Sequence, residues 1–224
     1  MHVPTVPLFP LRTVLVPGLV LPLHIFEPRY RLMVSTLAEA PEDERGFGIV
    51  AMRPGCTEAD GRAGIYEMGT MARITRVDAL PDGRYDIVTV GARRFSIESL
   101  DDALPYTRAH VRLHDEPIGE PGRTRALAAD AVRLLEEYRD VIAGWGVIRM
   151  AHIDNLPDDP VVLSYLVASA IVTDLPERQA LLGIDGAEQR LAAVCAVLRR
   201  EIEVMSALPS MPAVDLAGSR LWAN

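Results

Sequence analysis

The sequence predicts an α+β protein in which a β-barrel or β-sandwich precedes an all-helical bundle. The first half contains many short apolar and β-branched segments at hairpin spacing, and the second half has apolar residues at helical spacing. A Pro/Gly-rich segment, EPIGEPG at 116–122, separates the two patterns. We therefore predict a barrel subdomain at 1–117, a helical subdomain at 118–208 and an extended tail rich in proline and alanine at 209–224.

The strand-rich half begins with two apolar segments that contain prolines, at 6–11 and 13–23. Prolines suit edge strands and strand ends, because a proline has no N–H to donate to a neighbouring strand. Further along, Asp82-Gly83 separates two long segments and predicts the turn of a hairpin. The other strands that we expect lie at 46–52, 68–80, 84–100 and 108–116.

The helical half carries residues that typically begin helices. A first long helix is predicted from the apolar spacing within 125–142. Asp159 followed by Pro160 predicts an N-cap and a first helical position, where a missing N–H costs nothing. Two further pairs resemble capping boxes with aspartate in the usual serine or threonine position, namely Asp174 with Glu177 and Asp185 with Glu188.

Composition and charge disfavour several functions. The net charge of −8 disfavours a protein that wraps nucleic acid, because such binding neutralises phosphates with basic residues. All 23 basic residues are arginine, so a Schiff-base lysine, a P-loop lysine and a serine–lysine dyad are excluded. The start of the sequence is a poor signal peptide, and its apolar runs are too short to cross a bilayer. We expect a cytoplasmic protein with no membrane partner.

The stretch LPLHIFEPRYRLM at 21–33 contains the first candidate site. Pro28 suits the first position of a helix, and the carboxylate of Glu27 is favoured at the helix N-terminus. An arginine could bind this carboxylate through two hydrogen bonds. The motif is therefore either a recognition site or a structural ion pair that locks the helix to the barrel, and we favour the ion pair. The residues of the candidate site are Phe26, Glu27, Arg29, Tyr30, Arg93 and Arg94, and the three arginines are the candidates to pair with Glu27.

No arrangement of residues predicts catalysis or metal binding. His110 and His114 share a strand face but lie too far apart for easy chelation, and His24 is expected to be a core histidine. The hydroxyl of Ser164, within an apolar helical run, is expected to bond a backbone carbonyl. Cys195 lies on an apolar helix face and is expected in the core. We expect a protein that is not an enzyme and has no cofactor, metal or catalytic residue.

Several segments resemble the N-terminal domain of Lon-type proteases. They are PLFPLRTVLVPGLVLPLHIFEPRYRLMV at 7–34, FGIV at 47–50, GTMARI at 69–74 and LPDGRYDIVTVGARRF at 80–95. The resemblance covers most of the chain, and it implies a PUA-like β-barrel followed by a helical bundle. It also implies recognition of unfolded or degron-bearing polypeptides. The ATPase and serine–lysine peptidase activities of full proteases of this family are not implied, because both need a lysine that the sequence lacks.

These observations lead to one main functional hypothesis. We expect a stand-alone, non-catalytic polypeptide-binding module that acts as an adaptor or regulator of proteolysis. Its partner would be an unfolded or degron-bearing polypeptide, or a protease. The alternatives are a small-molecule-binding sensor and, less favoured, an RNA-binding domain. Self-association into a homo-oligomer is left open.

Overall fold

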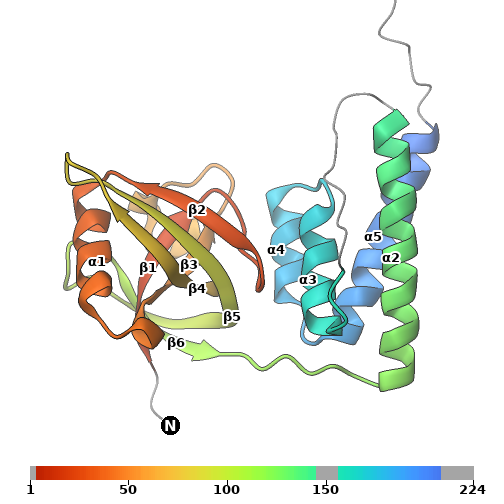
Figure 1. Ribbon diagram of the computed structural model, residues 1–224, viewed down its shortest axis with the longest axis horizontal. Helices are drawn as coiled ribbons and strands as arrows, with labels where there is room; N and C mark the ends of the chain where they lie inside the picture. The colour runs from red at the N-terminus through yellow and green to blue at the C-terminus, as the bar shows by residue number, and fades with distance from the viewer. Residues whose placement is uncertain (1–3, 145–155, 208–224) are drawn as a thin grey trace, which may run out of the picture.

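The computed structural model describes residues 4–144 and 156–207. A barrel of strands with one helix lies beside a bundle of helices, and an extended segment connects them (Figure 1). This arrangement confirms the predicted α+β class with a barrel before the helices. The extended tail predicted at 209–224 lies outside the described residues and stays a prediction.

A six-stranded sheet closes into the barrel. Its order is β2-β5-β4-β3-β1-β6, and a further pairing of β5 with β6 closes the ring, so that β2 remains outside the ring as an edge strand. β1 and β3 pair in parallel, and the other pairs are antiparallel. The bounds are Thr5–Leu11 (β1), Val20–Ile25 (β2), Gly46–Met52 (β3), Ile65–Ala79 (β4), Tyr85–Asp101 (β5) and Arg108–Leu113 (β6).

The length of β5 allows the sheet to close. Its first part pairs with β2 from Tyr85 to Val90, and its last part pairs with β6 from Phe95 to Asp101. β4 pairs with both parts, and two register shifts in this pairing accompany the bend of the sheet. The first part of β5 thus pairs with the edge strand β2, and its last part closes the ring with β6.

Two turns between strands contain a glycine with a positive φ, Gly18 and Gly83. The predicted hairpin is confirmed, because Gly83 has a φ of 78° and its N–H donates to the carbonyl of Leu80 between β4 and β5. The strand predicted at 13–23 is too long. β2 begins only at Val20, because Pro17 and Gly18 form a turn in which Gly18 has a φ of 84°, a conformation that favours glycine.

The helix α1 (Pro28–Glu39) begins at the predicted proline and covers the barrel core. Tyr30, Met33 and Val34 are its buried residues, and they pack with Phe9 and Phe47 of the strands. The two short 3₁₀ helices η1 (Glu42–Glu44) and η2 (Glu58–Gly64) lie in the loops before β3 and β4.

The helical bundle contains α2 (Pro121–Gly144), α3 (Pro160–Ala170), α4 (Leu175–Gly183) and α5 (Ala187–Ala207). The predicted N-caps are confirmed for α3 and α4, because Asp159 accepts the N–H of Val161 and Asp174 accepts the N–H of Glu177. Glu177 does not complete the predicted capping box, and its carboxylate binds Arg200 instead. The pair predicted before α5 forms other bonds. Asp185 pairs with Arg94 instead, and Glu188 accepts the N–H of Glu120.

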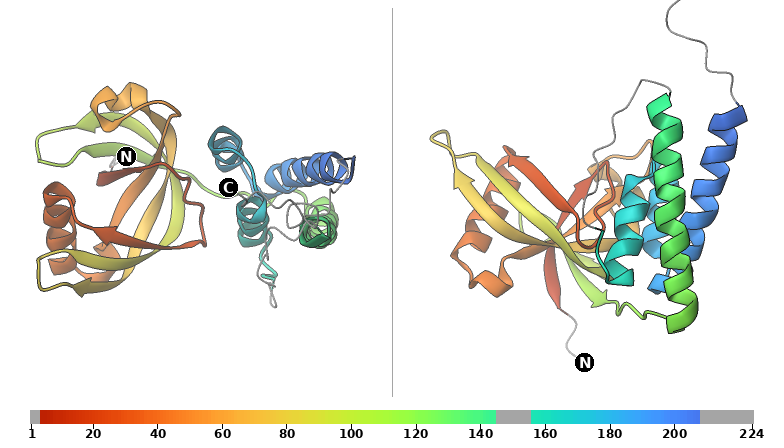
Figure 2. Two further views of the ribbon diagram at one scale, coloured as in Figure 1. Left: turned by 90° about the horizontal axis from the view of Figure 1, so that it is seen from above. Right: turned by 45° about the vertical axis from the view of Figure 1, so that its right-hand side comes forward.

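α3 and α4 lie between the barrel and the longer helices α2 and α5 (Figures 1 and 2). The junction has an apolar core made of residues from both halves: Val14, Val16, Ala51, Tyr165 and Leu182. None of the helices within the described residues combines the length and apolar character that a membrane crossing requires.

Candidate functional site

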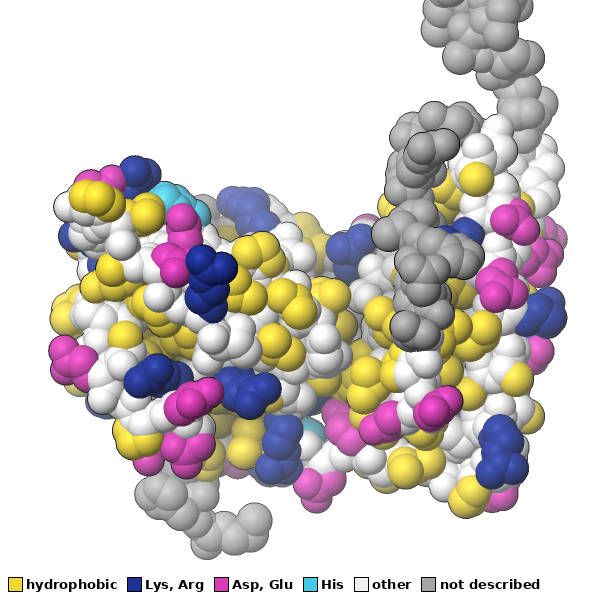
Figure 3. All heavy atoms as spheres, viewed as in Figure 1, with side chains coloured by type: hydrophobic (Ala, Val, Ile, Leu, Met, Phe, Trp, Pro, Cys, Tyr) yellow, Lys and Arg dark blue, Asp and Glu magenta, His cyan; other side chains and the backbone are white. Residues whose placement is uncertain are grey.

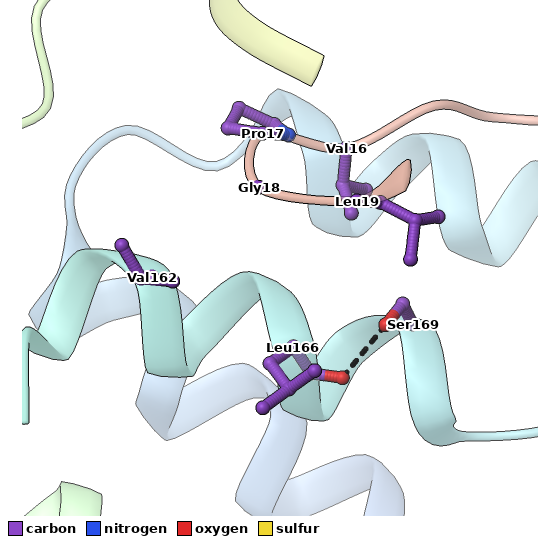
Figure 4. Close-up of a pocket in the computed structure, with 7 residues that line it drawn as sticks. All are labelled: Val16, Pro17, Gly18, Leu19, Val162, Leu166 and Ser169. Carbon is purple, nitrogen blue, oxygen red and sulfur yellow. Dashed lines mark hydrogen bonds between the residues drawn. The ribbon is translucent and has the colours of Figure 1, made fainter. Parts of the chain in front are cut away.

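An apolar groove lies where the barrel meets α3. Figure 3 shows apolar side chains gathered on both halves at this meeting place. We call the hollow the junction groove, and Figure 4 shows its lining residues: Val16, Pro17, Gly18, Leu19, Val162, Leu166 and Ser169. The one hydroxyl among them, on Ser169, donates to the carbonyl of Leu166 at 2.8 Å. The volume of about 40 Å³ suits a small aliphatic group.

The barrel wall of the groove depends on two glycines. The N–H of Gly18 donates to the carbonyl of Gly91 on β5, and the N–H of Gly91 donates to the carbonyl of Leu19. A Cβ atom on Gly91 would overlap the carbonyl oxygen of Val16. The close approach of this turn to β5 therefore requires glycine at position 91.

Exposed apolar side chains flank the groove. Val162 on α3 is 38% exposed, and Val20 at the start of β2 is also exposed. In the described part of the chain, β2 pairs with β5 along one edge and with no strand along the other. Leu19 of the groove leads directly into β2, whose open edge has carbonyl groups that can accept a partner strand but lacks an N–H at Pro22.

A polar cluster surrounds the carboxylate of Glu116, which lies in the segment that connects β6 to α2 and is 17% exposed. Oε1 of Glu116 accepts hydrogen bonds from Nε of Arg94 at 2.5 Å and from the hydroxyl of Tyr165 at 2.6 Å. Oε2 accepts a bond from Nη2 of Arg190 at 2.9 Å. Both arginine side chains are 0% exposed. We call these four residues the Glu116 cluster.

The cluster holds its groups in definite protonation states. Burial acts to raise the pKa of Glu116, but hydrogen bonds from Tyr165, Arg94 and Arg190 outweigh it and hold this pKa below its ordinary value. Burial is also the main cause that raises the pKa of the Tyr165 hydroxyl, so this group stays protonated and donates. The guanidinium of Arg190 lies 3.7 Å from the centre of the Tyr165 ring.

The EPRY motif, residues 27–30 of the stretch described above, forms a second polar group, on the barrel. Oε2 of Glu27 accepts bonds from Nε and Nη2 of Arg29 at 3.0 and 2.7 Å. Nη1 of Arg29 lies 2.7 Å from Oε2 of Glu58, which also accepts the Tyr30 hydroxyl. The interactions tie α1 to η2. No sequence signal pointed to Glu58, because it lies in a polar loop far from the motif.

The motif residues differ in exposure. Phe26 is 61% exposed, and its ring stacks with that of His24. Tyr30 is buried against Phe9, and burial is the main cause that raises the pKa of its hydroxyl. Beside Arg29 and Glu58 lies a larger hollow of about 490 Å³. A role of these residues in recognition stays a prediction.

The expectation that Arg93 or Arg94 could pair with Glu27 is wrong. Arg93 binds Asp115 through Nη2 at 2.9 Å, and Arg94 belongs to the Glu116 cluster. Both arginines lie in the part of β5 that pairs with β4 near Thr70, away from the start of α1. The predicted site residues therefore lie in two places. Phe26, Glu27, Arg29 and Tyr30 lie at the start of α1, and Arg93 and Arg94 lie on β5.

His24 is not the core residue that we expected. Its side chain is exposed, and Nδ1 lies 2.6 Å from Oδ1 of Asp86. The reason is that His24 shares the outward face of β2 with Val20 and Pro22, and the side chains on this face are exposed. Two expectations from the sequence are confirmed: Ser164 donates to the carbonyl of Val161, and Cys195 is buried. Across the described residues, no group of three or more metal-binding side chains comes together.

Comparison with known proteins relates this geometry to a family. Residues 5–200 match the family model described as the ATP-dependent protease La (LON) substrate-binding domain. The chain is 28% identical to Lon protease 2 of Myxococcus xanthus over 201 residues and 30% identical to Lon protease 2 of Herpetosiphon aurantiacus over 216 residues. These matches cover 89% and 92% of this chain but 24% of each relative. The chain thus spans about a quarter of the length of the curated relatives it matches.

Two solved structures have the same fold. The N-terminal domain of a Lon protease from the Mycobacterium avium complex gives a TM-score of 0.61 at 20% identity, covering 88% of this chain and 98% of that one. A Lon N-terminal domain protein from Xanthomonas campestris gives a TM-score of 0.57 at 23% identity, covering 86% and 98%.

Proposed function

The chain belongs to the ATP-dependent protease La (LON) substrate-binding domain family, and from this premise we propose that it is a non-catalytic module that binds polypeptide segments in the junction groove. Its proposed partners are unfolded or degron-bearing polypeptides or a protease, so that it acts as an adaptor or regulator of proteolysis in the cytoplasm. The absence of lysine from the sequence supports a role without ATPase or serine–lysine chemistry.

The observation that carries this proposal is the apolar lining of the junction groove. Its walls come from the β1–β2 turn and from α3, and its only hydroxyl is already bonded within α3. A site without free polar groups favours aliphatic side chains of many sequences over one defined ligand. The open edge of β2 supports the same function, because an extended segment can bond to its carbonyl groups and to its N–H groups on either side of Pro22.

The proposed boundaries follow the change of structure along the chain. We propose a barrel subdomain at 1–117 and a helical subdomain at 118–208. In support, β6 ends at Leu113 and α2 begins at Pro121. The groove then lies between the subdomains, which is a common place for a binding site.

Fluorescence anisotropy tests the proposal. A labelled, permanently unfolded polypeptide is titrated with the protein at low and at high salt, and we expect saturable binding that survives high salt because the groove is apolar. Replacing the exposed Val162 by Asp introduces a charge into the groove and should weaken binding at least tenfold. Absence of saturable binding at low salt would contradict the proposal.

A matched control separates the groove from general surface effects. Val204 is also an exposed valine on a helix of the bundle, but it does not line the groove. Val204→Asp should therefore bind the polypeptide like the parent protein. Equal weakening by both substitutions would show that the groove is not the site.

The larger hollow beside Arg29 and Glu58 favours a second candidate function, the binding of a small molecule. Its volume of about 490 Å³ and its mixed polar and apolar lining are typical of ligand sites. A thermal-shift screen of metabolites tests this function, because a ligand that binds only the folded state raises the unfolding midpoint. A hit that Arg29→Ala abolishes would support it, and a screen without hits would count against it.

A further inference from the structure

One carboxylate connects the two halves of the protein. Glu116 lies between the end of β6 and the start of α2, and it binds Arg94 from β5, Tyr165 from α3 and Arg190 from α5. We propose that Glu116 is a positioning residue that holds α3 against the barrel and thereby sets the width of the junction groove. Its importance for polypeptide binding rests on the function proposed above, whereas its effect on the junction does not.

Electrostatics explains why the carboxylate holds the junction closed. Arg94 belongs to the barrel and Arg190 to the helices, and both guanidinium groups are buried and bind the same carboxylate. Without its negative charge, two buried cations on opposite sides of the junction would repel each other. Asp185 also pairs with Arg94 at 3.2 Å, but its side chain is 78% exposed, whereas that of Glu116 is 17% exposed. Water screens it more strongly than it screens Glu116.

Arg94 and Arg190 also bind backbone carbonyls at the C-terminal end of α4. Nη1 of Arg94 donates to the carbonyl of Leu182 at 2.9 Å, and Nη2 of Arg190 donates to the carbonyl of Ile184 at 2.7 Å. The guanidinium groups are therefore oriented by fixed acceptors on the helical side. A change at Glu116 would be transmitted to this end of α4 as well as to α3.

The link to the groove runs along α3. Leu166, which lines the groove, directly follows Tyr165, and Val162 lies about one helical turn before it. The hydroxyl of Tyr165 is held by Glu116, so a shift of α3 away from Glu116 moves both lining residues relative to the β1–β2 turn. The width of the groove therefore depends on a bond made on a neighbouring face of the same helix.

The distance between the two halves can be measured directly. Thr36 on α1 and Glu203 on α5 are exposed and suit replacement by cysteine, each carrying a nitroxide spin label. The background carries Cys56→Ser, and the native Cys195 is buried and remains unlabelled. Pulsed electron paramagnetic resonance then gives the distribution of distances between the barrel and the helices in the full chain.

Substitution of Glu116 by Gln tests the proposal, because it keeps the shape and removes the charge. We expect a broader distance distribution with a longer mean than in the parent protein. Asp115→Asn is the matched control, since Asp115 is the preceding residue and pairs with Arg93 but is 96% exposed. It should leave the distribution unchanged. A folded Glu116→Gln protein with the parent distribution would overturn the proposal.

If Glu116→Gln does not fold, a second variant tests the proposal. Tyr165→Phe removes the hydrogen bond to Glu116 but keeps the ring that Arg190 covers. Broadening in this variant supports the proposal, and a distribution like that of the parent overturns it. Circular dichroism at the same temperature shows that the helices remain intact.

Polypeptide titration of the same variants tests the consequence for the groove. The variant that broadens the distribution should bind the labelled unfolded polypeptide at least threefold more weakly than the parent. A broadened junction with parental affinity would overturn the link between Glu116 and the groove. If the parent itself does not bind, the proposed function fails, while the distance measurement still decides the role of Glu116 at the junction.

Discussion

The hydroxyl of Tyr165 donates a hydrogen bond of 2.6 Å to Glu116, and the next residue, Leu166, lines the junction groove. The same helix thus contacts a partly buried carboxylate on one side and forms a wall of the groove on another. An aromatic hydroxyl that donates to a carboxylate makes a strong, charge-assisted hydrogen bond. Stability and groove geometry should therefore respond together to changes in this cluster.

Loss of the Glu116 charge should strongly destabilise the fold. Glu116→Gln leaves two buried guanidinium groups without their common anion, and we expect the free energy of unfolding to fall by about 3–5 kcal/mol. Urea unfolding followed by circular dichroism measures this change. Asp115→Asn should change it by less than about 0.5 kcal/mol, because its ion pair is exposed. Equal effects of the two substitutions would contradict the structure.

Acid should remove the contribution of Glu116. Its pKa in the folded state is lowered from the ordinary 4.5, so the unfolded state binds this proton more readily than the folded state. The contribution is complete above the unfolded pKa and is lost as pH falls through the folded pKa. The difference in unfolding free energy between the parent and Glu116→Gln should therefore be constant near neutral pH and shrink below about pH 4.5. A difference that grows with acidity would have the wrong sign.

The barrel wall of the groove should not tolerate a side chain at Gly91. Gly91→Ala places a methyl group against the carbonyl of Val16 and should destabilise the protein by about 1–3 kcal/mol. Gly183→Ala is the control, because no atom lies within 4 Å of the added Cβ at the end of α4. This control should be neutral or stabilising by up to about 1 kcal/mol. Thermal unfolding of both variants checks the contrast.

Phe26 and Tyr30, two aromatic residues of the stretch at 21–33, should behave differently. Phe26→Ala removes an exposed ring and should leave the free energy of unfolding within about 0.5 kcal/mol of the parent. If the edge of β2 takes part in binding, it should weaken polypeptide affinity by up to about tenfold. Tyr30→Phe loses the bond to Glu58 and should cost about 0.5–1.5 kcal/mol of stability without changing affinity. The opposite pattern would place recognition at Tyr30.

Local patterns were enough to predict most of the elements. The turn at Asp82-Gly83, the caps at Asp159 and Asp174, and the start of α1 at Pro28 all depend on neighbours within a few residues. Such interactions join residues that are close in the sequence, so they can be predicted without knowledge of the tertiary structure. The Glu27–Arg29 ion pair belongs to the same class.

Tertiary structure alone decided the junction. The three partners of Glu116 lie 22, 49 and 74 positions away in the sequence, and no spacing rule connects residues at such separations. The exposure of His24 was not predictable for the same reason, since an alternating pattern separates the two faces of a strand but does not show which face the rest of the protein covers. The sequence by itself therefore determined the order and type of the elements and the residues that begin them. Closure of the barrel and docking of the helices decided which charged side chains became buried together, because burial depends on all elements that surround a residue.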